Sequence, residues 1–147
     1  MRVKLLLLLL AVSLLSGCSL LDKVDQSLNY VNEATQFINS GTRLAEQLPN
    51  LATQAISDPE ARTAIKNEFM EMKARIEAFN KLEPPAFAKS IHEQLLAYNE
   101  TLTKQINTYL EQMNVGQIDW KSLTDSSLIQ TLDQITQILD KLQNLTQ

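Results

Sequence analysis

Apolar residues recur three or four positions apart almost throughout the chain from Leu20 to Leu142, and this spacing limits the possible folds most. It places the apolar side chains on one face of an α-helix. Little interrupts it, since the 147 residues include three glycines and four prolines. No run alternates with the two-residue period of a strand. The sequence therefore predicts an all-α fold whose helices pack their narrow apolar faces together.

The first helical segment is predicted from near Leu20 to about Leu48. Its expected apolar face consists of Val24, Leu28, Val31, Thr35, Ile38, Leu44 and Leu48. Gly41 lies inside this segment, and a glycine costs ~1 kcal/mol in a helix interior. We therefore expect a kink or a break at Gly41. Pro49 is expected to start a new turn, followed by a short helical continuation over residues 51–56.

The second helix has the clearest start signal. Asp58 precedes Pro59 and can cap the helix, while Glu60 adds negative charge near the positive end of the helix dipole. The predicted buried stripe is Ala61, Ile65, Phe69, Met72, Ile76 and Phe79. Pro84 and Pro85 follow, and the residue before a proline avoids the helical region. The helix is therefore expected to end near Leu82.

Two further helices complete the expected fold. The third runs from about Ala86 to Met113, with a stripe of Ile91, Leu95, Tyr98, Leu102, Ile106, Tyr109 and Met113. Gly116 is placed to end it in the left-handed conformation. Thr124 or Asp125 is expected to cap the last helix, whose apolar face is Leu128, Leu132, Ile135, Leu139 and Leu142. Short connections favour antiparallel neighbours, so we predict an up-and-down bundle of about four helices.

The first seventeen residues have the features of a secretory signal peptide. Arg2 and Lys4 precede an apolar stretch over residues 5–15, which is shorter than the ~20 residues that span a bilayer. The stretch ends in Leu-Ser-Gly-Cys, which resembles the bacterial lipobox. We therefore expect cleavage of residues 1–17 and lipidation of Cys18, leaving a single domain over residues 18–147. An ordinary signal peptide and an uncleaved anchor helix are the alternatives.

Cysteine content and charge limit the partners. Cys18 is the only cysteine, so no internal disulfide is possible. Without Arg2 and Lys4, the 13 basic residues become 11 against 17 acidic ones, which gives the mature chain a net charge of −6. No basic cluster favours nucleic acid or anionic lipid head groups. Membrane attachment is therefore expected to depend on acyl chains (palmitate or similar) at Cys18.

We find no pattern that predicts catalysis, a cofactor or a metal. His92 is the only histidine, and Leu96 stands where a zinc-protease motif would need its second histidine. We expect His92 to be a surface or partly buried residue. The alternating acidic and basic residues of the second helix, and the Glu100–Lys104 pair of the third, fit a solvated helix face. The chain is therefore not expected to be an enzyme.

Two aromatic residues are possible partner contacts. Tyr30 lies off the line of apolar residues in the first helix, so we expect it to be exposed. Trp120 lies in a polar connector, where it can cover the end of the bundle or mark a binding edge. Tyr98 and Tyr109 lie on an apolar stripe and are expected in the core.

Several segments of the chain resemble a family of small lipoproteins of unknown function from Gram-positive, spore-forming bacilli. They are the lipobox with Ser19-Leu20-Leu21, residues 27–34 (SLNYVNEA), 58–61 (DPEA), 79–85 (FNKLEPP), 92–94 (HEQ) and 134–140 (QITQILD). The resemblance extends over nearly the whole chain. It implies a Gram-positive host and an extracytoplasmic location at the cell membrane. It carries over no catalytic or binding residue.

These observations leave two expectations for function. The first is a helical protein–protein interaction module of the cell envelope that binds another envelope protein or itself. The second is a bundle that binds a small apolar ligand between its helices.

Overall fold

The computed structural model describes residues 18–144, with the side chains of residues 25–144. The predicted signal peptide and the side chain of Cys18 lie outside the described residues. Within the described range the regular structure is entirely helical, which confirms the all-α prediction. None of the described helices is both long and apolar enough to cross a membrane.

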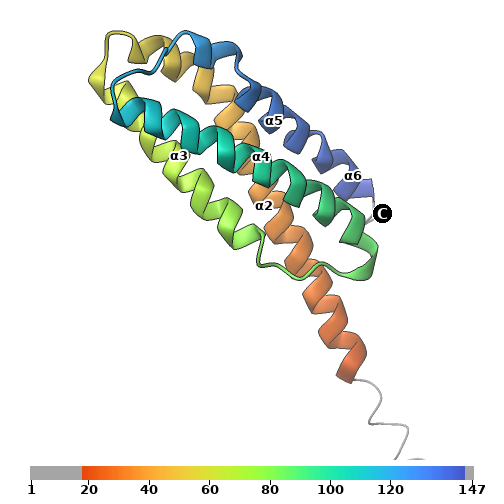
Figure 1. The fold of residues 1–147 in the computed structure, drawn as a ribbon. Helices are drawn as coiled ribbons and strands as arrows, with labels where there is room; N and C mark the ends of the chain where they lie inside the picture. Colours follow the sequence, from red (N-terminus) through yellow and green to blue (C-terminus); the bar gives the residue numbers. More distant parts are fainter. Residues whose placement is uncertain (1–17, 145–147) are drawn as a thin grey trace, which may run out of the picture.

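The helices form an elongated up-and-down bundle (Figure 1). Four α-helices and two short 3-10 helices precede the final α-helix: α2 (Cys18–Ala55), α3 (Pro59–Phe79), η1 (Ala86–Ala88), α4 (Lys89–Asn114), η2 (Ser122–Asp125), α5 (Ser127–Thr136) and α6 (Ile138–Asn144). α2 packs against α3 and against α5, while α4 completes the bundle by packing against both of them. α5 and α6 together occupy the fourth position of the bundle (Figure 1).

α2 is continuous, so the predicted break at Gly41 is wrong. A Cβ atom added at Gly41 would lie 3.6 Å from Ile135 and 3.6 Å from Leu132, because α2 and α5 pack closely at this point. The helix also continues through Pro49 to Ala55, where we expected a new turn. Leu48 on one side of Pro49 and Ala52 on the other are fully buried. The stability gained by burying this face outweighs the loss of helix stability that Gly41 and Pro49 cause.

α3 begins and packs as predicted. The Asp58 carboxylate accepts a hydrogen bond from the backbone N–H of Glu60 at 2.8 Å, and Pro59 is the first helical residue. The six residues predicted to be buried are the six that the helix buries. Local capping and the 3.6-residue period therefore determine this helix.

The ends of α4 and α5 agree in part with the predictions. Gly116 adopts a φ of 68°, and the neighbouring Gln117 N–H donates to Gln112 O at 2.9 Å, as in a glycine-ended helix. The cap of α5 is Ser126, whose hydroxyl accepts from Ile129 N–H at 3.4 Å. The expected caps, Thr124 and Asp125, belong instead to η2.

The face that α2 buries agrees with the predicted one from Ile38 onward and differs from it before that residue. Leu28 is 59% exposed and Val31 only partly buried. The buried residues of this helix are Tyr30, Ala34, Phe37, Ile38, Leu44, Leu48, Ala52 and Ala55. The prediction is confirmed for Ile38, Leu44 and Leu48. Three of the buried residues are small alanines, Ala34, Ala52 and Ala55. The start of α2 projects beyond the bundle, where no neighbouring helix can bury its apolar residues (Figure 1).

Candidate functional site

Tyr30 lies in the core, which corrects its predicted role as an exposed contact. Its side chain is 3% exposed, and its hydroxyl lies 3.2 Å from Nδ1 of His92. Its ring is 6.4 Å from that of Phe79. α2 turns Tyr30 inward because the same helix face carries Ala34 and Phe37, which are also buried.

His92 is more deeply buried than predicted, at 6% exposure. Its ring lies 5.1 Å from Phe79 and 5.7 Å from Tyr30. Burial lowers the pKa of His92, and the nearby Glu93 carboxylate opposes this effect only in part. Burial also raises the pKa of Tyr30 to about 12. Both side chains are therefore neutral near pH 7, and they form a hydrogen-bonded pair inside the bundle.

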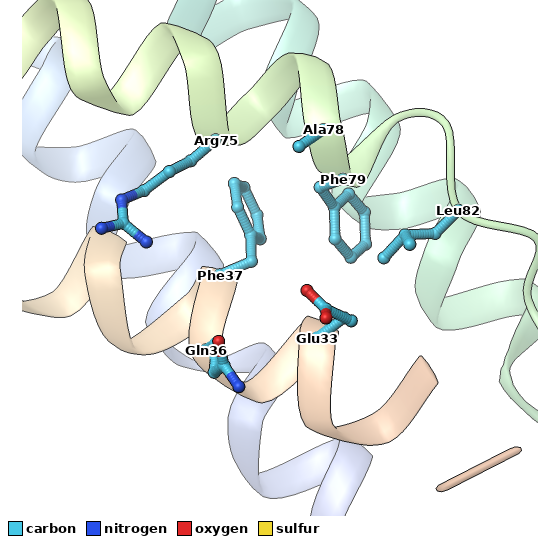
Figure 2. Close-up of a pocket in the computed structure, with 7 residues that line it drawn as sticks. All are labelled: Glu33, Gln36, Phe37, Arg75, Ala78, Phe79 and Leu82. Atoms are coloured by element: carbon cyan, nitrogen blue, oxygen red, sulfur yellow. The ribbon is translucent and has the colours of Figure 1, made fainter. Parts of the chain in front are cut away.

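A pocket of about 300 Å³ opens between α2 and α3 near this pair (Figure 2). The stacked rings of Phe37 and Phe79, 4.6 Å apart, form its apolar part. Glu33 points toward the rings from α2, while Arg75 extends from α3 along the side of Phe37 that faces away from Phe79 (Figure 2). A second hollow of about 220 Å³ shares Glu33 and Leu82 with it, so the two hollows adjoin.

A second cleft lies between α3 and α4. One hollow of about 370 Å³ is lined by Lys66, Met70, Lys73, Ala74, Glu77, Leu110 and Asn114. A hollow of about 180 Å³ continues it and is lined by Arg62, Thr63, Lys66, Met113, Asn114 and Trp120. The two share Lys66 and Asn114, and we call them together the α3–α4 groove.

Trp120 lies at one end of the α3–α4 groove. It is partly buried and packs against the core, and the Arg62 guanidinium lies 6.0 Å from its ring centre. The same guanidinium donates to Ala55 O at 2.7 Å and to Ile56 O at 3.0 Å. Arg62 thus connects Trp120 to the end of α2, so Trp120 both covers the bundle end and borders a cleft.

Two ion pairs lie on exposed helix faces in the described part of the chain. Glu71 pairs with Arg75 and Glu100 with Lys104, each four positions apart as expected on a solvated helix face. These partners hold the pKa of both glutamates below its usual range. Among the side chains of residues 25–144, no cluster of three or more histidine, cysteine or acidic groups is placed to hold a metal ion.

Sequence reasoning missed the grouping of Lys66, Met70 and Lys73 with residues of α4. The signal was present as a lysine, a methionine and a lysine at helical spacing on one side of α3. This pattern alone predicted no site, because the groove also needs residues of α4. Asn114, for example, is 48 positions from Lys66 in the chain.

Comparisons with known proteins identify the family. Residues 30–145 match a family of unknown function, DUF6376. The chain is 36% identical over 145 residues to the "Uncharacterized lipoprotein YybP" of Bacillus subtilis (strain 168), covering 97% of this chain and 98% of that protein. No solved structure matches. The chain therefore belongs to the DUF6376 family, as the resemblance in its sequence predicted.

Proposed function

We propose that the chain is a lipid-anchored lipoprotein of the extracytoplasmic face of the cell membrane. In this proposal residues 1–17 are removed, and residues 18–147 form one domain attached through acyl chains on Cys18. The lipobox and the relative that is named a lipoprotein support the anchor. Two or more long acyl chains make release from the membrane very slow.

The domain acts, we propose, as a helical module that binds another envelope protein. The observation that carries this proposal is the contrast between a filled core and open clefts bordered by exposed apolar side chains. Phe69, Leu95 and Leu102 are fully buried in the interior. Met70 is 56% exposed beside the α3–α4 groove. Exposed apolar residues beside a groove are typical of surfaces that bind other proteins.

Site-specific photo-crosslinking in the host membrane tests this function. A photoreactive residue is placed in the full-length lipoprotein at exposed positions on different faces: Leu28, Met70, Phe87, Val115 and Gln130. We expect a reproducible adduct with one protein from one face. An absence of adducts at every position, together with a monomer in detergent, would contradict an interaction module.

The alternative function is binding of a small apolar ligand in the cleft between α2 and α3. The stacked Phe37 and Phe79 rings favour it, and about 300 Å³ is at the lower end of the range for ligand pockets. Native mass spectrometry of protein purified from host membranes is the test. A bound small molecule that Ala78→Leu displaces, and that the control Ala74→Leu retains, would favour this alternative. A protein mass without ligand would remove it.

A further inference from the structure

The α3–α4 groove carries positive charge on a protein that is acidic as a whole. The mature chain has a net charge of −6. The groove is nevertheless lined by Arg62, Lys66 and Lys73, with Glu77 as its one carboxylate among the described residues. A local charge opposite to the net charge favours acidic partners at this place on the surface.

The two lysines are held across the groove by neutral groups. Lys73 Nζ donates to Asn107 Oδ1 at 2.6 Å, and Lys66 Nζ donates to Asn114 Oδ1 at 3.4 Å. The ion pairs within residues 25–144 involve other side chains. Each ammonium group is therefore positioned at the groove with its charge still available to a carboxylate.

An apolar strip runs between and beyond the lysines. Met70 lies between them in the sequence, and Leu110 and Met113 border the groove from α4. Leu110 and Met113 pack partly against the core, which fixes the floor of the groove. Methionine side chains adapt to differently shaped apolar partners. Trp120 ends the strip with a large aromatic surface of the kind enriched at interface hot spots.

We propose that the α3–α4 groove binds an acidic amphipathic helix of a partner protein. This inference rests on the proposed interaction function. The apolar face of the partner helix contacts Met70, Leu110 and Met113. Its carboxylates bind Lys66 and Lys73, which lie seven positions apart on α3, or about 10.5 Å along the helix axis. The partner therefore carries acidic residues about two turns apart beside an apolar stripe.

The position of the groove favours a protein over the anchoring membrane. The end of α4 and the connector from α4 to η2 lie at the end of the bundle opposite the start of α2 (Figure 1). Trp120 belongs to this connector. The lipid on Cys18 would hold the start of α2 at the membrane. The Trp120 end of the groove then faces away from the lipid head groups and toward other proteins of the envelope.

Photo-crosslinking of the full-length lipoprotein in host membranes, with mapping of the crosslinked peptide, tests the inference. A probe at Met70 is compared with a probe at the similarly exposed Leu28. We expect the Met70 adduct to map to an acidic, helical-period segment of another protein. In the Lys66→Glu/Lys73→Glu variant the adduct should fall by about tenfold, since two favourable contacts become repulsive.

Lys141→Glu is the matched control. Lys141 Nζ also donates to a neutral amide on another helix, Gln94 Oε1, at 3.3 Å, but it lies outside the α3–α4 groove. This variant should leave the Met70 adduct unchanged. Circular dichroism and thermal unfolding check that all variants keep the fold.

The outcomes separate the inference from the function on which it rests. Adducts at Leu28, Phe87, Val115 or Gln130 without one at Met70 would support the interaction function and overturn the groove inference. A Met70 adduct that maps to a basic or uncharged segment, or to a second copy of this chain, would also overturn it, as would insensitivity to the double charge reversal. No adduct at any position would overturn both.

Discussion

At the residue scale, His92 and Tyr30 form a polar contact inside an aromatic cluster. Both are almost fully buried, and the cluster also contains Phe37 and Phe79. Each polar group is costly to bury alone, and their mutual hydrogen bond offsets part of that cost. The pair is therefore a specific contact between α2 and α4 within an otherwise apolar interface.

Stability should fall as pH decreases below about 6.5. His92 has a lowered pKa in the folded protein, so the unfolded chain, with a histidine pKa of about 6.5, binds more protons between the two values. The contribution of neutral His92 to the free energy of unfolding is fully present above pH 6.5 and is lost progressively as the pH falls below that value. Urea unfolding at pH 7.5 and pH 5.0 measures this difference. The His92→Asn variant should be less stable at both pH values but show a smaller difference between them. An equal difference in both proteins would contradict this role of His92.

Tyr30→Phe should lower the free energy of unfolding by about 1 kcal/mol. The change retains the buried ring and removes the hydroxyl that contacts His92 Nδ1. Urea unfolding at pH 7.5 gives the value, and the control is Tyr98→Phe, since Tyr98 is only partly buried. A cost of Tyr30→Phe no larger than that of the control would mean that the hydrogen bond adds nothing.

At the element scale, α2 is the helix against which most of the bundle packs. It contacts α3, α5, α6 and η2 along one face. Its continuity through Gly41 and Pro49 therefore depends on the neighbours that cover it. The twelve positions of α2 that precede Tyr30 correspond to about 18 Å of helix, and the start of α2 projects from the bundle (Figure 1). In the proposed function, this projecting part of α2 is a spacer between the lipid on Cys18 and the bundle.

Gly41→Ala should raise the free energy of unfolding by about 0.5–1 kcal/mol, because alanine is favoured over glycine in a helix interior. The added methyl group would make ordinary contacts with Ile135 and Leu132 at 3.6 Å. Gly116→Ala is the opposite case. It has open space around the added atom but a φ of 68°, so it should cost about 1–2 kcal/mol. Denaturant unfolding of both variants measures whether each substitution raises or lowers the free energy of unfolding. A destabilising Gly41→Ala would show that α2 and α5 pack too tightly for the methyl group.

At the scale of the whole molecule, an anchor, a helical spacer and a bundle follow one another in the chain. The anchor is a prediction from the lipobox, and the spacer and bundle are the described helices. In the proposed function, this order holds the two clefts at different distances from the membrane. The cleft beside Tyr30 is lined by residues from the first half of α2. The connector from α4 to η2, which contains Trp120, lies at the end of the bundle opposite the start of α2 (Figure 1).

Cys18→Ser should release the protein from the membrane fraction without altering the fold. The substitution removes the thiol that would carry lipid, and it lies twelve positions before the buried Tyr30. Membrane fractionation and circular dichroism measure the two effects, and Ser19→Ala serves as the neighbouring control. Retention of Cys18→Ser in the membrane after removal of residues 1–17 would contradict the anchor. An intact mass of the native protein with an unmodified thiol would contradict it equally.

The sequence by itself determined where the helices lie and how several of them end. Asp58 and Pro59 start α3, and Gly116 ends α4, because caps and left-handed glycines depend on atoms only a few residues away. The stripe of α3 is equally readable, since its large apolar residues follow the helical period over the whole element.

The tertiary structure decided which face of α2 is buried and which distant residues meet. Tyr30 and His92 are 62 positions apart, and Lys66 and Asn114 are 48 apart, so no local pattern could place them together. Gly41 and Pro49 remain helical because packing of α2 against its neighbours stabilises the helix more than these residues weaken it. Local sequence thus defined the elements, while the core contacts between them formed the buried pair and the clefts.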